Sequence, residues 1–149
     1  MATRIQVTID CADPNRLVEF WAAALHYRPQ QPPEDHPTWK SYWLSKGIPE
    51  DELEGAENID SIEDPDGVGP RFWFQRVPEA KAGKNRLHLD LSVSGGRAVP
   101  VETRRERVHA EAERLIALGA TRLRILYTEG VDHYGETLQD PEGNEFCLH

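Results

Sequence analysis

The residues best suited to catalysis lie near position 88, where a histidine and an aspartate alternate with leucines. His88 and Asp90 stand between Leu87, Leu89 and Leu91. This period of two predicts a strand that turns both polar side chains to one face. Histidine changes charge near neutral pH, so His88 beside a carboxylate can act as a general acid or base. The alternative is a histidine that only forms hydrogen bonds in a polar cleft.

Thiol chemistry has two candidates, because the sequence contains only Cys11 and Cys147. It has no C-x-x-C spacing, which gives no support to a disulfide framework or a structural zinc site. We therefore expect both residues to be reduced thiols. Cys147 can ligate a soft metal such as zinc together with His88. Free cysteines are also among the most buried residue types, and a buried thiol is usually inert.

Aromatic side chains form the second group of site candidates. Trp73 shares a face with Gln75 in an expected strand, and Trp43 lies within Trp39–Leu44, where we expect another strand. Small-molecule sites are usually concave pockets with aromatic walls and a few polar groups, so we assign Trp43 and Trp73 to ligand binding. His133 stands just before the last Asp-Pro turn and is a candidate for the mouth of the site. The alternative for His133 is a surface loop.

A strand followed by a helix must position the first of these groups. Residues 4–10 alternate between aliphatic and polar side chains, which predicts a half-buried strand. Asp13 then supplies an N-cap and Pro14 a first helical residue. Phe20 and Trp21 lie on the apolar stripe of this helix, and we assign them to the core.

The same pattern returns in the second half of the chain. Residues 87–93 alternate again, and Val101–Leu115 carries an apolar stripe at helical spacing. Gly119 stands where a left-handed cap ends a helix, and residues 121–127 predict a further strand. The repetition of strand and helix in the same order indicates an internal duplication.

Matching turns close both halves. Asp64–Gly67 reads Asp-Pro-Asp-Gly and precedes Phe72–Gln75, while Asp140–Gly143 reads Asp-Pro-Glu-Gly and precedes Asn144–Cys147. Proline presets φ and glycine accepts positive φ, as a tight turn requires. We therefore expect one domain, 1–149, with these parts: repeat 1 at 1–80 including an acidic loop at 30–63, a linker at 81–85, and repeat 2 at 86–149.

Composition and charge exclude several kinds of partner. The formal net charge is −9, and no basic stripe offsets its repulsion of phosphate backbones, so we expect no nucleic acid. No apolar run is long enough to cross a bilayer, and residues 1–4 lead into a strand pattern instead of a signal-peptide core. We expect no membrane partner and a cytoplasmic location.

Four segments together resemble a known family: Gly69–Gln75, Val77–Glu79, Lys84–Leu91 and Asp140–Cys147. They resemble the glyoxalase-like branch of the vicinal oxygen chelate superfamily, which contains glyoxalases, bleomycin-resistance proteins and dioxygenases. The resemblance extends over nearly the whole chain. It implies an α+β fold of two tandem βαβββ modules that form a pseudo-symmetric half-barrel cleft. It also implies a small-molecule ligand in that cleft and a homodimer.

The resemblance further implies where a metal would bind. In metal-dependent members, four ligands come from the first and last strands of the two halves. Because aliphatic side chains face the helices, Gln6 and His88 face the cleft as equivalents, and superposing the closing strands makes Gln75 equivalent to Cys147. Related glyoxalase I enzymes carry glutamates in those closing strands, and amides are weak ligands. We expect no metal or other cofactor; if a divalent metal binds, its ligands are His88, Cys147, Gln6 and Gln75.

Two functions follow from this resemblance. The first is a protein that binds or sequesters a metabolite or antibiotic, as bleomycin-resistance relatives do, without glyoxalase I activity. Its ligand-binding residues are Gln6, Thr8, Trp43, Trp73, Gln75, His88, Asp90, His133 and Cys147. The alternative is a lyase or isomerase that uses His88 with Asp90 or Cys147 as catalytic residues, with or without a weakly held divalent metal.

Overall fold

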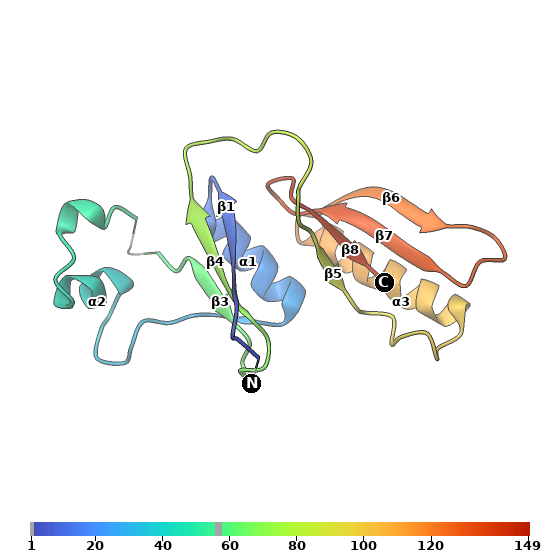
Figure 1. Cartoon of the computed structure of the whole chain (residues 1–149), viewed down its shortest axis with the longest axis horizontal. Coiled ribbons are helices and arrows are strands. Elements are labelled where there is room, and N and C mark those ends of the chain that lie inside the picture. The colour runs from blue at the N-terminus through green and yellow to red at the C-terminus, as the bar shows by residue number, and fades with distance from the viewer. Residues whose placement is uncertain (1, 56–57) are drawn as a thin grey trace. The chain divides into compact units, whose positions relative to one another are not determined.

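The chain forms two compact units, Met1–Ala80 and Lys81–His149, here called the N-terminal and C-terminal units. The computed structural model describes residues 2–55 and 58–149. In these residues each unit combines helix with a four-stranded sheet (Figure 1). The expected α+β class is confirmed.

The N-terminal unit is built around a mixed sheet of order β1-β4-β3-β2. Strand β1 runs parallel to β4, and the other neighbours are antiparallel. Residues 56 and 57, in the expected acidic loop 30–63, lie outside the described residues. The elements are β1 (Gln6–Cys11), α1 (Pro14–Leu25), β2 (Arg28–Pro29), α2 (Trp39–Ser45), the 3-10 helix η1 (Glu50–Glu52), β3 (Ser61–Glu63) and β4 (Arg71–Arg76).

Helix α1 covers one face of this sheet and forms the core of the unit. It begins as the sequence predicts, with Asp13 accepting a hydrogen bond from the backbone N–H of Arg16 at 3.5 Å and Pro14 in the first turn. Trp21 is buried, and Phe74 of β4 is buried as well. The expected core position of Trp21 is confirmed, which leaves the opposite face of the sheet open.

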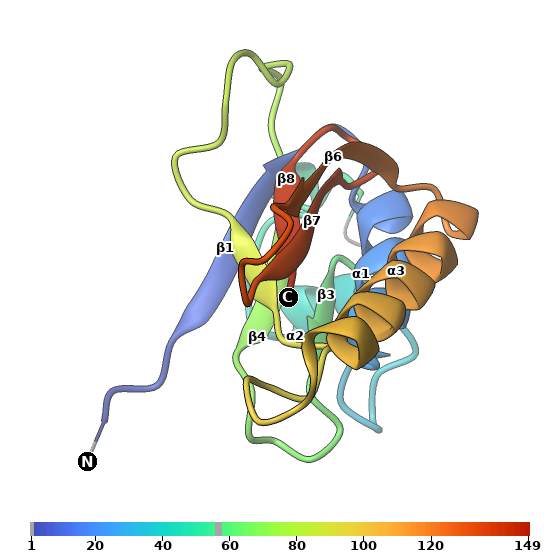
Figure 2. The same cartoon turned by 90° about the vertical axis from the view of Figure 1, so that its right-hand side faces the viewer.

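The C-terminal unit repeats this arrangement. Its sheet has the order β5-β8-β7-β6, with β5 parallel to β8 and antiparallel pairing elsewhere. Helix α3 packs against β6 and β7 (Figure 2). The elements are β5 (Leu89–Leu91), α3 (Val101–Ala117), β6 (Thr121–Tyr127), β7 (Tyr134–Gln139) and β8 (Glu145–Leu148). The expected order βαβββ is therefore found twice.

The two Asp-Pro turns have the same internal hydrogen bonds. Asp64 accepts from the backbone N–H of Asp66 at 3.0 Å, and Asp140 accepts from that of Glu142 at 2.9 Å. The closing glycines have φ values of +68° at position 67 and +84° at position 143, which only glycine adopts without strain. Each turn leads into the strand that pairs with the first strand of its unit.

The segment Trp39–Leu44, for which the aromatic residues predict a strand, forms helix α2, so that prediction is wrong. A capping box starts this helix: Thr38 Oγ1 accepts from the backbone N–H of Ser41 at 3.1 Å, and Ser41 Oγ accepts from that of Thr38 at 3.4 Å. The capping box outweighs the strand preference of the aromatic side chains. In addition, β5 is shorter than the expected 87–93, and His88 immediately precedes it.

The core of the C-terminal unit contains a carboxylate. Glu136 of β7 has no exposed surface, and its oxygens accept hydrogen bonds from three side chains. Tyr134 donates its hydroxyl at 2.9 Å, Arg122 its Nε–H at 2.7 Å, and Nδ1 of His109 lies at 3.1 Å. A buried charge requires such partners, so this cluster links α3 to β6 and β7.

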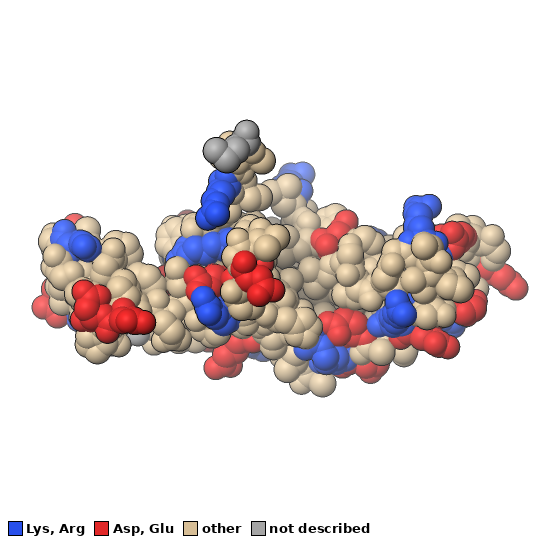
Figure 3. Space-filling view, turned by 90° about the horizontal axis from the view of Figure 1, so that it is seen from below, with Lys and Arg blue, Asp and Glu red and all other residues tan. Residues whose placement is uncertain are grey.

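Two further properties concern the helices and the charged surface. None of the helices in the described residues is both long and apolar enough to cross a membrane. On the face drawn in Figure 3, acidic and basic side chains are interspersed.

Candidate functional site

The open face of the N-terminal sheet carries the polar side chains of β1 and β4. Thr8 pairs with Trp73 and Asp10 pairs with Gln75 across the parallel ladder. Phe74, which lies between Trp73 and Gln75 in β4, is buried on the side of the sheet that α1 covers. The open face is therefore the side on which small molecules can approach the sheet.

A pocket of about 590 Å³ lies on this face, a volume within the usual range of small-molecule sites. Helix α2 and the strands β1 and β4 all contribute to it, so the pocket lies within the N-terminal unit. Among the described residues it is lined by Gln6, Gln30, Trp39, Tyr42, Trp43, Asn58, Asp60, Arg71 and Trp73.

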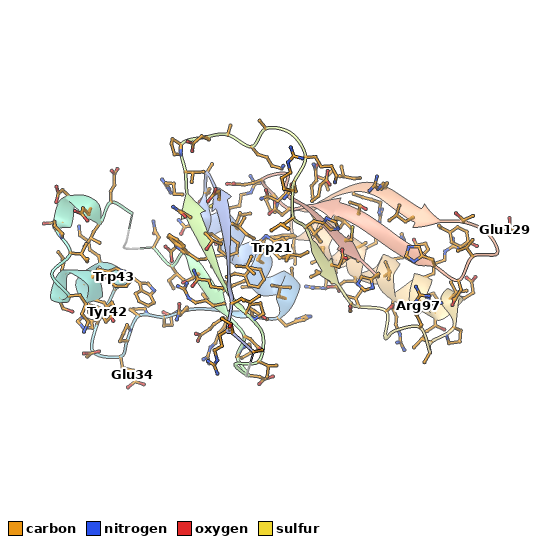
Figure 4. The ribbon with its side chains drawn as sticks, in the orientation of Figure 1. Trp21, Glu34, Tyr42, Trp43, Arg97 and Glu129 are labelled. Atoms are coloured by element: carbon orange, nitrogen blue, oxygen red, sulfur yellow. The ribbon has the colours of Figure 1, made fainter. Side chains whose placement is uncertain are left out.

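Four aromatic side chains wall this pocket. On α2 the rings of Trp39 and Trp43 stack with centroids 6.0 Å apart and 23° between their planes, and Tyr42 packs edge-on against Trp43 at 4.9 Å. Figure 4 shows Tyr42 and Trp43 on this helix. The indole N–H of Trp39 donates to the backbone oxygen of Gln30 at 3.1 Å. These contacts hold the pocket wall in position, because the hydrogen bond of Trp39 anchors one edge of the aromatic cluster to the backbone of Gln30, directly after β2.

The polar groups of the pocket are held in defined positions. Arg71 donates from Nε to Gln30 Oε1 at 2.7 Å and from Nη1 to Gln6 Oε1 at 2.6 Å. Trp73 donates its indole N–H to Asp60 Oδ2 at 2.8 Å. An arginine and an aspartate thus both face a largely aromatic cavity.

The structure brings together some of the residues that the sequence assigns to ligand binding. Gln6, Trp43 and Trp73 line the aromatic pocket. Thr8 lies beside it and accepts a hydrogen bond from Gln6 Nε2 at 3.5 Å. Gln75 lines a neighbouring pocket of about 360 Å³ that also includes Trp73. Their roles in binding stay predictions.

Sequence reasoning missed several residues of this pocket. The positions of Trp39, Tyr42 and Trp43, spaced by three and four residues, signalled one helix face. Arg71 stands two residues before Trp73 and so shares its face. These two patterns were sufficient to find three of the four aromatic residues of the wall and the arginine, whereas the partners Gln30 and Asp60 had no local signal.

The C-terminal unit has a different cluster on its open face. His88 Nε2 lies 3.3 Å from Asp90 Oδ1, and Asp90 pairs with Cys147 across the ladder of β5 and β8. One ligand atom from each of the three residues lies within 4.8 Å of the others. Thr137 Oγ1 lies 3.5 Å from Cys147 Sγ. His133 is exposed before β7 and lies outside this three-residue cluster.

A lysine pairs with a carboxylate on the strand that carries Cys147. Lys84 forms a hydrogen bond with Glu145, and this bond holds the pKa of the Glu145 carboxyl below its ordinary range. Glu145 is two residues from Cys147 on the same strand. The Lys84–Glu145 pair therefore places an ionised carboxylate, which already has a basic partner, on the same strand as the Cys147 thiol.

Sheet register corrects one expected equivalence. Phe74 pairs with Ile9, and Phe146 pairs with Leu89. Superposing the closing strands therefore places His88 on Thr8, two residues away from the expected Gln6. Gln6 and Gln75 belong to one unit while His88 and Cys147 belong to the other, so a shared four-residue site stays a prediction.

The donor set of the C-terminal cluster fits a divalent metal better than the set expected from sequence. Imidazole, carboxylate and thiolate are three strong ligand types, whereas the expected set held two amides. Asp90 supplies the carboxylate, which the expected set lacked. A thiolate with an imidazole suits zinc more than manganese or magnesium, and three protein ligands leave a position open for water or substrate.

Comparison with known proteins gives one consistent fold. A family model described as a glyoxalase-like domain matches residues 6–149, and no curated protein matches the chain. A glyoxalase/bleomycin resistance protein/dioxygenase family enzyme from Burkholderia phytofirmans is similar with a TM-score of 0.59 and 16% identity, over 96% of this chain and 94% of that one.

Two fosfomycin resistance proteins are similar to the same degree. FosX from Mesorhizobium loti has a TM-score of 0.58 and 12% identity, over 100% of this chain and 92% of that one. A variant of FosX from Listeria monocytogenes, in complex with Mn(II) and 1S,2S-dihydroxypropylphosphonic acid, has a TM-score of 0.59 and 13% identity, over 100% and 90%. At these identities the structural likeness concerns the fold.

Proposed function

Because the chain belongs to the glyoxalase-like domain family, we propose that it binds and sequesters a small organic molecule in the aromatic pocket of its N-terminal unit. The observation that carries this proposal is the pocket of about 590 Å³ with three tryptophans and a tyrosine in its wall. Aromatic walls with a few fixed polar groups are the usual form of a small-molecule site.

The exposure of α2 supports a ligand on this wall. None of the described residues 39–45 is buried, although three of them are large aromatics. Trp43 is 40% exposed, and its indole N–H has no acceptor in the part of the chain that the structure describes. Exposed apolar patches with a polar rim mark binding surfaces, and a bound ring removes this surface from water.

The absence of glyoxalase I activity forms part of the same proposal. Gln75 and Cys147 occupy the closing strands, where the resemblance implies a proton-transferring glutamate. An amide is not a proton acceptor near neutral pH, and neither side chain is a carboxylate base. The protein should therefore not turn over the hemithioacetal of methylglyoxal, even with added nickel or zinc.

The test is a thermal-shift and calorimetric screen of wild-type protein against organic acids, amines and neutral aromatic compounds. We expect ligands whose affinity falls about tenfold or more in Trp43→Ala, because a stacked aromatic contact is lost. Leu44→Ala on the same helix is the matched control, since Leu44 is exposed but does not line the pocket. Metal-dependent glyoxalase I turnover, or equal binding by both variants, contradicts the proposal.

The cluster of His88, Asp90 and Cys147 favours a second function, a metal-assisted lyase or isomerase. A FosX structure contains Mn(II), and in this chain the three residues offer a set of ligand atoms that suits zinc best. A divalent ion bound there supplies Lewis-acid polarisation of a substrate oxygen.

Metal content distinguishes the two functions. Under the second function, elemental analysis of wild-type protein finds stoichiometric zinc or another divalent metal, and His88→Ala loses it. His109→Ala is the control, because His109 lies on α3 beside Glu136 instead. Wild-type protein that stays metal-free after exposure to zinc rules this second function out.

A further inference from the structure

We propose that the aromatic pocket recognises an aromatic carboxylate, whose ring lies against the tryptophans of α2 and whose carboxylate pairs with Arg71. This inference rests on the proposed function, because it names the class of molecule that the same pocket holds.

Arg71 is a positive charge with neutral partners. Both acceptors of its guanidinium are amide oxygens, Oε1 of Gln6 and Oε1 of Gln30. Among the described residues no carboxylate lies within ion-pair distance of it. Amides fix the geometry of the guanidinium without neutralising its charge, so the charge stays available to an anionic ligand.

The two amides are themselves fixed. Ser61 is fully buried and donates its hydroxyl to Gln30 Oε1 at 3.2 Å. In return, the backbone N–H of Gln30 donates to the backbone carbonyl oxygen of Ser61 at 2.9 Å. On the other side, Gln6 donates its amide N–H to Thr8. Both amides therefore turn their oxygens toward Arg71. Such preorganisation lowers the entropy that a ligand loses in ordering its site.

The guanidinium keeps free donors for a ligand. Only Nε and Nη1 of Arg71 have acceptors in residues 2–55 and 58–149, which leaves N–H groups at Nη2 without one. A planar guanidinium binds a carboxylate through two parallel N–H bonds. Arg71 also lines the cavity, so the bound carboxylate lies in the pocket.

The shape of the wall selects the rest of the ligand. The nearly parallel rings of Trp39 and Trp43 present one extended aromatic surface, and stacking favours a flat ring. Asp60, the acid of the pocket, already accepts the indole N–H of Trp73 at 2.8 Å. Its bond holds the opposite wall in place. Asp60 and Arg71 both have neutral partners among the described residues, but Arg71 is fixed by two amides and keeps N–H donors at Nη2 for a ligand. This fixed guanidinium favours an anion, and a cationic aromatic ligand at Asp60 is the competing outcome of the test.

Isothermal titration calorimetry with three matched probes tests this inference: indole-3-acetate, 3-methylindole and tryptamine share a ring and differ in charge. We expect wild-type protein to bind indole-3-acetate most tightly. Arg71→Gln should weaken indole-3-acetate by about tenfold or more, the usual effect of a lost charge-assisted hydrogen bond, and leave 3-methylindole unchanged. Arg16→Gln is the control, because Arg16 lies on the exposed surface of α1.

A second measurement does not depend on the folding of a variant. The affinity of wild-type protein for indole-3-acetate should fall as sodium chloride rises, while that for 3-methylindole should not, because salt screens charge pairs near a surface. Equal binding of the three probes, or tightest binding of tryptamine with loss in Asp60→Asn, overturns the anion assignment and leaves the proposed function standing. If none of the probes binds but a library compound without a carboxylate does, the anion assignment also fails. If no compound of any class binds, the proposed function itself fails.

Discussion

Glu136 places a carboxylate where water cannot reach it, and three side chains donate to it or lie within bonding distance. Removing it by Glu136→Ala leaves Arg122 and the Tyr134 hydroxyl without their acceptor in the core. We expect a loss of about 3 kcal/mol of unfolding free energy, as is typical when one partner of a buried ion pair is removed. Urea unfolding followed by far-UV circular dichroism measures it.

Two further variants make this prediction specific. Glu136→Gln keeps the volume and one acceptor oxygen, so its loss should be smaller than that of the alanine variant. Glu113→Gln removes the other carboxylate that contacts Arg122 at 2.7 Å, but Glu113 is solvent-exposed and little change is expected. Equal effects at both glutamates contradict the assigned importance of the buried carboxylate.

Tyr134 makes the same cluster sensitive to alkaline pH. Burial, together with the Glu136 carboxylate, raises the pKa of the Tyr134 phenol to about 12. An unfolded tyrosine has a pKa of about 10, so the protonated phenol contributes stability that is complete below pH of about 10. This contribution is lost as the pH rises through about 12.

An alkaline titration checks this shift. The absorbance of tyrosinate in the folded protein should include a component near pH 12, and Tyr134→Phe should lack it. The variant should also lose less stability than wild type between pH of about 10 and 12. A titration that is identical in both proteins contradicts the shift.

At this scale the sequence allowed the face of a residue to be predicted but not its register. A shift of two residues leaves every side chain on the same face, so alternation cannot distinguish Gln6 from Thr8 as the counterpart of His88. Only the ladder, which pairs Leu89 with Phe146, decides it. The face of Arg71 could be predicted from its spacing to Trp73, but its amide partners come from distant segments and could not.

Helix α2 carries three of the four aromatic residues of the pocket wall yet contributes no buried residue. Its stability therefore depends on local terms, above all on the Thr38 cap. Thr38→Ala should cost about 1 kcal/mol of helix stability and reduce hydrogen-exchange protection of the Trp43–Ser45 amides about fivefold. The melting temperature of the protein should change little.

The matched control for this prediction lies at the other end of the helix. Ser45 donates its hydroxyl to the backbone carbonyl oxygen of Tyr42 at 2.6 Å and takes no part in the cap. Ser45→Ala should therefore leave hydrogen exchange in α2 close to wild type. A large fall in melting temperature for Thr38→Ala, similar to that of Glu136→Ala, would show instead that α2 belongs to the cooperative core.

Elements with strong local signals were predicted and α2 was not. The Asp13 cap, the helix stripes and both Asp-Pro turns each combine a period with a specific turn or cap residue. In Trp39–Leu44 the aromatic residues favour a strand in general, and the short cap signal at Thr38 was not weighed against them. Local propensity is weakest where an element is short and exposed.

The two-unit architecture was the most predictable property of the whole molecule. Strand, helix and turn signals recur in one order, and agreement among several local signals is strong support for a fold. A homodimer and a cytoplasmic location follow from no feature of the described residues and stay predictions. The same holds for a site shared by both units.

The tryptophans give the molecule a built-in optical reporter. All four lie in the N-terminal unit: Trp39, Trp43 and Trp73 line one pocket, and Trp21 is in the core with 1% of its surface exposed. Acrylamide should therefore quench most of the emission, and a saturating aromatic carboxylate such as benzoate should shield it. His88→Ala should leave the spectrum unchanged, because no indole lies in its unit. The tryptophan emission of this protein thus reports pocket occupancy, and the C-terminal unit, which has no tryptophan, does not contribute to that signal.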